Sequence, residues 1–352
     1  MSGSAARTAT ADVVCLGESM VTFLPSQPGR LADVPSFSRG IGGAESNVAC
    51  ALAAAGHRAK WVGRVGADGF GDHLVDTIAG YGVDTSAVRR DPGRPTGIYF
   101  RTATDRATDT HEVAYYRAGS AASAMSPDNV PYEDLLAARI LHLSGITAAL
   151  STDCLALLEN LTAPRDARPL ISFDVNHRPG LWRDGAAGPE VLLALARRCD
   201  LVFVGEDEAE EAWGVLGTEA VRAALPEPSV LVVKRGSDGV TVFSRTDDGT
   251  ERDTVTTVPS LGVDVVAAVG AGDAFAAGFL SATLRDLPVR DRARHGHLMA
   301  AAVLTVPGDL TGPPSRAYAD RLAALDDDAW GTLRLGPGWT LAAGANEEVR
   351  AT

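Results

Sequence analysis

Short runs rich in β-branched residues alternate with longer amphipathic segments along most of the chain, and this alternation restricts the fold more than any other feature of the sequence. The runs that predict strands are Asp12–Gly17, Trp61–Val65, Ile140–Ser144, Leu170–Val175, Leu201–Val204 and Val230–Val233. The segments that predict helices are Ala44–Ala55, Asp72–Tyr81, Ser151–Leu161 and Pro189–Cys199. Strands and helices in this alternation form a doubly wound, mostly parallel sheet with helices on both faces. The sequence therefore predicts an α/β fold, in which ligands bind beyond the carboxyl ends of the strands.

Two segments depart from this alternation. Met20–Ser38 and Thr96–Arg117 contain residues that alternate between apolar and polar without a helical period. We expect them to form antiparallel strands inserted between the first strand–helix units, in a small sheet that would cover a site at the strand ends. Outside this body, residues 1–11 are expected to form a disordered tail, and residues 326–352 a surface extension rich in Gly, Pro and charge.

The formal net charge of −13 argues against a nucleic acid or an anionic membrane as partner. The N-terminal residues lack the apolar core of a signal peptide, and no apolar run is long enough to span a membrane. The four cysteines lie far apart with no Cys-x-x-Cys pair, which indicates neither a disulfide framework nor a zinc site and fits a reducing cytoplasm. In so acidic a chain, an anionic ligand must be held by local positive charge: arginines, a helix N-terminus or a metal ion.

The stretch AVGAGDAF at 268–275 is the first candidate for such a site. It leads into a segment with helical spacing, so its amides lie at a helix N-terminus, where they have no partners within the helix and favour an anion. Gly270, Ala271 and Gly272 allow a ligand to approach the backbone closely, and Asp273 can accept the proton of a substrate hydroxyl. The alternative is that Asp273 only caps the helix, and the stretch by itself leaves both interpretations open.

A second glycine pair precedes another predicted helix. Gly42 and Gly43 permit backbone contact with a ligand, and the Asn47 amide can both donate to and accept from a polyol. An ordinary loop with a capping residue explains the same stretch equally well. The sequence contains no P-loop, HExxH, GxSxG or GxGxxG motif, which excludes the nucleotide-binding and hydrolase sites that those motifs form.

Three stretches in this order resemble the ribokinase-like (PfkB) family of sugar kinases: GGAESN at 42–47, KRGSDG at 234–239 and GAGDAFAAGF at 270–279. The likeness covers roughly Asp12 to Leu325 and implies one kinase domain, with a Rossmann-like body and a β-sheet lid, that uses ATP and Mg²⁺. By this resemblance Asp273 is the base that activates the acceptor hydroxyl, and the residues assigned to the anion hole are Gly270, Ala271 and Gly272. The residues assigned to the nucleotide phosphates are Lys234, Gly236 and Gly239, and the acidic residue associated with magnesium is Glu208.

Two further motifs resemble those of 2-keto-3-deoxygluconate kinases, in which YxR and NxR surround a sugar acid. The residues that they would contribute to the substrate site, together with one tyrosine on the preceding lid strand, are Tyr99, Tyr115, Arg117, Asn176 and Arg178. Two arginines suit a carboxylate, because the planar guanidinium binds carboxylates through two parallel hydrogen bonds. The alternative is that both arginines are solvated surface charges, as most arginines are.

Some positions depart from the family pattern. An Asp and a Thr that contribute to a monovalent cation site in some relatives are replaced by Ala267 and Ala268, which puts dependence on such a cation in doubt. The asparagine that usually stands three residues before the magnesium-associated glutamate is Gly205 here. Thr22 stands where ribokinases carry an aspartate that holds sugar hydroxyls, which disfavours ribose.

The resemblance as a whole implies a cytoplasmic, homo-oligomeric kinase, with the lid strands as a candidate dimer contact. It would transfer the γ-phosphoryl group of Mg·ATP to the terminal hydroxyl of a sugar acid, 2-keto-3-deoxygluconate. One alternative is a kinase for a neutral ketose such as fructose on the same fold. The other is a non-catalytic sugar-binding or regulatory protein, which the departures at Gly205, Ala267 and Ala268 favour and the intact Asp273 disfavours.

Overall fold

The computed structural model describes residues 10–102, 112–165, 168–182, 188–245 and 253–341. Three parts of the predicted segments lie outside the described residues: the tail up to residue 9, residues 103–111 of the second lid segment, and residues 342–352 of the predicted extension.

The body is built on an eight-stranded sheet in the order β14-β13-β12-β11-β10-β9-β1-β4. In chain order its strands are β1 (Ala11–Leu16), β4 (Ala59–Val62), β9 (Ala138–Ser144), β10 (Leu170–Asp174), β11 (Leu201–Gly205), β12 (Val230–Lys234), β13 (Val240–Ser244) and β14 (Thr254–Val258). In the sheet order, each pair of adjacent strands between β12 and β4 is parallel. β13 and β14 extend the sheet beyond β12 as antiparallel strands. The predicted α/β fold with a mostly parallel, doubly wound sheet is confirmed.

Two details of the strands differ from the prediction. The run expected at Trp61–Val65 divides at Gly63, and the short β5 (Arg64–Gly66) leaves the main sheet to pair with β6 (Arg89–Asp91). Gly63 lies against the indole of Trp61, since a Cβ at this position would be 2.5 Å from the ring. The antiparallel strands β13 and β14 at the sheet edge are not among the predicted strands.

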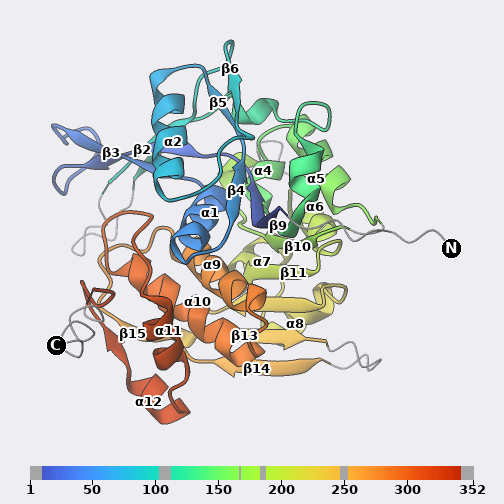
Figure 1. Ribbon diagram of the computed structural model, residues 1–352, viewed down its shortest axis with the longest axis vertical. Helices are drawn as coiled ribbons and strands as arrows, with labels where there is room; N and C mark the ends of the chain where they lie inside the picture. Colours follow the sequence, from blue (N-terminus) through green and yellow to red (C-terminus); the bar gives the residue numbers. More distant parts are fainter. Residues whose placement is uncertain (1–9, 103–111, 166–167, 183–187, 246–252, 342–352) are drawn as a thin grey trace.

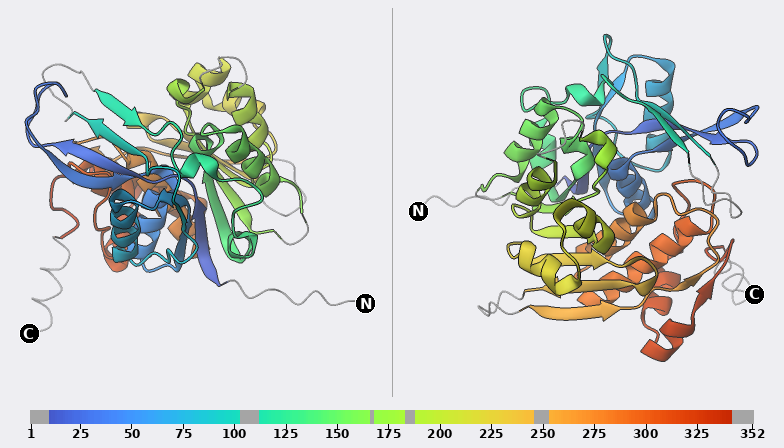
Figure 2. Two further views of the ribbon diagram at one scale, coloured as in Figure 1. Left: turned by 90° about the horizontal axis from the view of Figure 1, so that it is seen from above. Right: turned by 180° about the vertical axis from the view of Figure 1, so that it is seen from behind.

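Helices cover both faces of the sheet (Figures 1 and 2). One core is shared with α1 (Ala44–Ala54), α2 (Gly69–Gly80), α9 (Ala271–Leu284), α10 (Val289–Leu304) and α11 (Arg316–Ala323). A second core is shared with α3 (Tyr132–Leu136), α4 (Gly145–Ala148), α5 (Thr152–Thr162), α6 (Gly188–Ala196), α7 (Glu206–Trp213) and α8 (Thr218–Ala224). In the described part of the chain, no helix combines the length and apolar character needed to cross a membrane.

A separate four-stranded sheet, which we call the lid, projects from the body (Figure 2, left). Its order is β3-β2-β7-β8, and its strands are β2 (Met20–Pro25), β3 (Phe37–Gly42), β7 (Ile98–Arg101) and β8 (Val113–Tyr116). The pairs β2–β3 and β7–β8 are antiparallel as expected, whereas the central pair β2–β7 is parallel. β3 continues beyond the predicted end at Ser38 as far as Gly42, so the lid leads directly into the N-terminus of α1.

The expected surface extension is not what the structure shows for residues 326–341. These residues form α12 (Asp327–Thr332) and β16 (Arg334–Leu335), which pairs with β15 (Gly262–Val263). Trp330 is fully buried in the core shared with α9 and α10, and its Nε1 donates a hydrogen bond to the Pro259 carbonyl oxygen at 3.0 Å. The composition of the segment indicates a surface position on average, but one buried indole anchors it to the core.

Candidate active site

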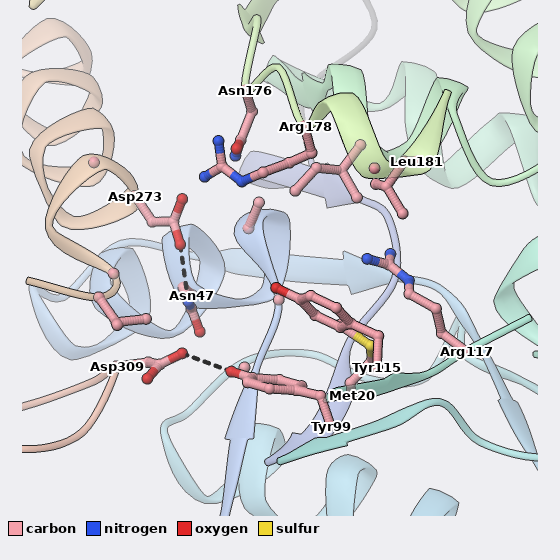
Figure 3. Close-up of a pocket in the computed structure, with 18 of the residues that line it drawn as sticks. Met20, Asn47, Tyr99, Tyr115, Arg117, Asn176, Arg178, Leu181, Asp273 and Asp309 are labelled. Carbon is pink, nitrogen blue, oxygen red and sulfur yellow. Dashed lines mark hydrogen bonds between the residues drawn. The ribbon is translucent and has the colours of Figure 1, made fainter. Parts of the chain in front are cut away.

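A cavity of about 1020 Å³ opens between the body and the lid, at the carboxyl ends of the parallel strands. Asp174 and Lys234, the last residues of β10 and β12, line it from the sheet. Tyr99 and Tyr115 face it from the lid (Figure 3). The edge of the sheet that this cavity occupies is the one at which doubly wound folds bind their ligands.

The GAGD motif forms the first turn of α9 on one wall of the cavity. Gly270 has φ +79°, and a Cβ there would lie 2.6 Å from the carbonyl oxygen of Asp309, so both its conformation and this close approach require glycine. The Asp273 carboxylate accepts a hydrogen bond from Asn47 Nδ2 at 2.8 Å, and the described residues supply no side-chain cap for α9. Asp273 therefore faces the cavity instead of capping its helix. Two motifs that lie 226 positions apart meet in one site.

The surroundings of Asp273 make its carboxylate a stronger base than usual. Partial burial raises the pKa of Asp273 to about 7, and the negative charges of Asp174 and Asp309 act in the same direction. The hydrogen bond from Asn47 and the ammonium of Lys234 lower this pKa and offset only part of the rise. A carboxylate that titrates near neutral pH can accept a hydroxyl proton and release it afterwards.

We expect the pH dependence of kcat/KM to show an acid limb near pH 7, because the Asp273 carboxylate must be unprotonated to accept a proton. Activity falls as the pH is lowered through this value and levels off above it. Replacement of Asn47 by Leu removes a hydrogen bond that lowers the pKa of Asp273, so the limb is expected to move to higher pH. Initial rates between about pH 5 and pH 9 measure both profiles. A limb that stays in place in Asn47→Leu would contradict the assignment to Asp273.

Most of the predicted site residues line this one cavity: Gly42, Gly43, Asn47, Tyr99, Tyr115, Arg117, Asn176, Arg178, Glu208, Lys234, Gly270, Gly272 and Asp273. Ala271, Gly236 and Gly239 do not line it. Gly239 lies in the turn between β12 and β13, where it has φ +95° and a Cβ would be 2.2 Å from the Val258 carbonyl oxygen. The structure thus explains this glycine by the turn, and its contact with a nucleotide stays a prediction.

The two arginines predicted to hold a carboxylate do not lie together. Arg117 is nearly buried and forms an ion pair with the buried Glu18, which also accepts a hydrogen bond from Ser120 at 2.6 Å. The buried Nε of Arg117 has no hydrogen-bond partner in the described residues, so Glu18 does not satisfy the whole donor fork. Arg178 is 54% exposed, lies 3.5 Å from the Glu208 carboxylate, and points to the opposite side of the cavity (Figure 3). The predicted joint clamp is therefore not formed, and Arg117 alone remains on its side of the cavity.

Three carboxylates of the site are not among the predicted residues: Glu18, Asp174 and Asp309. Asp309, in the loop after α10, accepts a hydrogen bond from the Tyr99 hydroxyl at 3.0 Å and is paired with Arg101 at 2.9 Å. It lies 210 positions from Tyr99 and belongs to no motif, so the sequence carries no signal for it. Asp174 differs, because it lies one residue before the end of the predicted strand Leu170–Val175, and the rule that ligands gather at strand carboxyl ends points to it.

Asn176 combines backbone strain with an open acceptor. Its φ of +43° lies in the left-handed region, which residues other than glycine rarely adopt. Its Oδ1 is buried and finds no hydrogen-bond partner within the described ranges. Strain and an unsatisfied polar atom at a cavity wall are typical of ligand sites, and they support the predicted ligand contact of Asn176.

Glu208 suits a water-mediated contact with Mg²⁺ better than a direct one. Its Oε2 accepts a hydrogen bond from the Gly205 amide at 2.8 Å, and its Oε1 faces Arg178. The residues that the structure describes contain no group of three His, Cys, Asp or Glu side chains able to hold a metal ion. Mg²⁺ keeps several waters and binds proteins through one or two carboxylates and the substrate phosphates, so a single carboxylate at the wall fits it.

Comparisons with known proteins agree with this geometry. A family model described as pfkB family carbohydrate kinase matches residues 10–316. The chain is 35% identical over 310 residues to a 2-dehydro-3-deoxygluconokinase of Bacillus subtilis, which covers 87% of this chain and 93% of that protein (2-dehydro and 2-keto name the same sugar acid). It is 30% identical to the probable fructokinase-6 of Arabidopsis thaliana, over 82% of this chain and 75% of that protein. The crystal structure of a 2-dehydro-3-deoxygluconokinase from Thermotoga maritima matches with a TM-score of 0.76 at 26% identity, over 90% of this chain and 98% of that one.

The matched region takes in the sheet, the lid and both motifs that meet at the cavity. It also takes in the loop of Asp309, which the motifs alone do not indicate. The resemblance seen in the sequence is therefore confirmed: the chain belongs to the pfkB family of carbohydrate kinases and is an ATP-dependent sugar kinase.

Proposed function

We propose that the chain phosphorylates the terminal hydroxyl of a sugar acid, in particular 2-keto-3-deoxygluconate, with Mg·ATP as donor. The observation that carries this proposal is the arrangement in Figure 3, where Asp273 and Arg117 face one cavity from opposite sides. A proton acceptor on one side suits a hydroxyl, and a guanidinium on the other suits a carboxylate. A six-carbon sugar acid carries these two groups at its two ends.

At the acid end, the substrate carboxylate would bind the cavity side of the Arg117 guanidinium, since Glu18 pairs with its Nη2 and its Nε is buried. The ring of Tyr115 lies 5.8 Å from the guanidinium carbon and helps to hold its plane. The residues proposed to position the sugar hydroxyls are Gly43, Asn47, Tyr99 and Asp309.

At the reacting end, Asp273 accepts the proton of the terminal hydroxyl. The hydroxyl oxygen bonds to the γ-phosphorus as the bond to the bridging oxygen of ADP breaks. The amides at residues 270–272 and the dipole of α9 stabilise the charge on the transferring group, and Lys234 and Arg178 add positive charge on the same side. Mg²⁺, held by Glu208 through water, would neutralise charge on the phosphates. The lid excludes water, which would otherwise accept the phosphoryl group.

A kinase for a neutral ketose such as fructose is the second candidate. The ion pair between Arg117 and Glu18 favours it, because Glu18 already neutralises the charge of Arg117 and no substrate carboxylate is needed to do so. The similarity to a plant fructokinase is in line with this alternative. The two candidates differ in whether Arg117 contributes to substrate binding.

Joint replacement of Arg117 and Glu18 tests this contribution. Arg117→Met alone would leave Glu18 buried and unpaired, at a cost of about 3–5 kcal/mol, so it is combined with Glu18→Gln. We expect KM for 2-keto-3-deoxygluconate to rise roughly 10- to 100-fold, because a hydrogen bond to a charged group is lost. Little change in kcat is expected, since the contact is the same in the ground and transition states.

Arg117→Lys is the matched control, because it keeps the charge next to Glu18 and loses only the planar fork. Its KM is expected to lie between those of the wild type and the double variant. A coupled assay of ADP release gives KM and kcat for the wild type, the double variant and Arg117→Lys. A KM that stays within about twofold in the double variant would exclude the carboxylate contact and favour the ketose.

A further inference from the structure

Two charged residues at strand ends form an ion pair beside the catalytic carboxylate. Asp174 is 3% exposed, and both of its carboxylate oxygens lie 3.2 Å from Lys234 Nζ. Asp174 ends β10 and Lys234 ends β12, and β11 lies between these strands in the sheet. The lysine side chain therefore reaches across the end of β11, and its contact with Asp174 fixes where the ammonium lies in the cavity.

The same ammonium lies against the first turn of α9. A Cβ on Gly272 would be 3.6 Å from Lys234 Nζ, and both residues line the cavity together with Asp273. The charge of Lys234 lowers the pKa of Asp273, and in turn the charge of Asp273 raises the pKa of Lys234. Lys234 thus has acidic neighbours on three elements, β10, α7 and α9, and its hydrogen bonds go to Asp174.

We propose that Asp174 is a positioning residue, which binds Lys234 and so prevents the ammonium from pairing with Asp273. The inference rests on the proposed role of Asp273 as the base. A carboxylate paired with an ammonium has a lower affinity for a proton, so a lysine that is held by another carboxylate leaves the base effective. The held ammonium stays at the N-terminus of α9, where it adds positive charge beside the transferring phosphoryl group. Asp174 takes part in no bond change, and the hydroxyl proton goes to Asp273.

Other groups also act on the base or on the lysine, but do not bind the lysine. Asp309, in the loop after α10, raises the pKa of Asp273 by its charge, and Asn47 on α1 donates a hydrogen bond to it. Glu208 on α7 acts on the lysine through its charge. Among the described residues, Asp174 is the carboxylate that accepts hydrogen bonds from the lysine ammonium. Its removal therefore leaves Asp273 as a near partner for that ammonium.

Asp174→Asn, Lys234→Gln and their combination test this role in the full chain. The assay uses Mg·ATP with 2-keto-3-deoxygluconate or fructose, whichever the wild type turns over. We expect Asp174→Asn to lower kcat roughly 100-fold, because the ammonium is misplaced. It should also move the acid limb of kcat/KM by about one pH unit to lower pH, because the negative charge of Asp174 near Asp273 is lost and the released ammonium pairs with Asp273.

Lys234→Gln is expected to move the limb in the opposite direction, to higher pH, because a positive charge beside Asp273 is lost. When Asp174→Asn is added to Lys234→Gln, kcat should fall by less than about threefold, since no ammonium remains to be positioned. The double variant carries two amides that can hydrogen-bond in place of the ion pair. If Asp174→Asn alone does not fold, the double variant can therefore still be compared with Lys234→Gln.

Asp200→Asn is the matched control, because Asp200 binds Arg168 through both oxygens at 2.8 Å, just before β11 and at the other end of the same sheet. Its kcat and limb should stay close to those of the wild type. The proposal is overturned if Asp174→Asn leaves the limb in place, or if it moves the limb and lowers kcat by the same amounts with and without Lys234. A wild type without an acid limb, or an active Asp273→Asn variant, would contradict the role of Asp273 as the base. These measurements therefore show whether the role of Asp273 or only that of Asp174 is wrong.

Discussion

Asp273→Asn is expected to lower kcat by about 10²- to 10⁴-fold, because an amide cannot accept the proton of the acceptor hydroxyl. KM for both substrates should change little, since Asn has the size of Asp and its oxygen can still accept the hydrogen bond from Asn47. Release of ADP at about pH 8, with saturating Mg·ATP and sugar, measures the effect. A variant that retains more than about a tenth of the wild-type kcat would contradict the role of Asp273 as the base.

The same substitution is expected to stabilise the protein without ligands at neutral and alkaline pH. Folding raises the pKa of Asp273 from its ordinary value of 3.8 to about 7, so the wild type loses stability as the pH rises between these two values. The neutral amide avoids this loss. We expect a gain of about 1–3 kcal/mol in the free energy of unfolding at pH 8 and almost none near pH 4. Urea unfolding at both pH values measures it, and an equal effect at both would contradict the raised pKa.

Trp330→Ala is expected to lower the free energy of unfolding by about 3–5 kcal/mol. The indole is fully buried, its ring lies 4.5 Å from the guanidinium carbon of Arg294, and its Nε1 bonds to the Pro259 carbonyl. Truncation leaves a cavity in the core, removes the hydrogen-bond donor of the Pro259 carbonyl and removes the ring next to Arg294. Urea unfolding measures the loss, and kcat of the folded fraction should be unchanged because Trp330 does not line the cavity.

Trp330→Phe is the control for this substitution. It keeps most of the apolar area and loses the hydrogen bond, so about 1–2 kcal/mol is expected. A loss of less than about 1 kcal/mol in Trp330→Ala would show that residues 326–341 are not part of the core.

The features predicted from the sequence are those that follow from local rules. A run of small residues before a helical pattern predicts that Gly270 starts a helix and that the amides there are free, and the structure has this arrangement. The same rule places Asn47 in the first turn of α1. The strand-end rule places the cavity, because every parallel strand of the sheet ends at the same edge. Local rules do not reveal that the Asn47 amide binds Asp273, which only the packing of α1 against α9 brings about.

The residues that were not predicted owe their roles to contacts between distant segments. Glu18 follows β1 in the body and meets Arg117 of the lid, so neither sequence position indicates the pair. Asp309 reaches the cavity from an irregular loop after α10 and pairs with Arg101 on β7. Composition alone does not predict the position of residues 326–341, because this mostly polar segment is anchored to the core by one buried side chain, Trp330.

The ratio of kcat/KM for 2-keto-3-deoxygluconate to kcat/KM for fructose, measured with the wild type and Mg·ATP, tests the central claim most directly. If the cavity binds a sugar acid between Asp273 and Arg117, the ratio should be at least about 10², because only the keto acid offers a carboxylate to the Arg117 guanidinium at the cavity wall. A ratio near or below one would contradict this assignment and show that the cavity serves a neutral ketose.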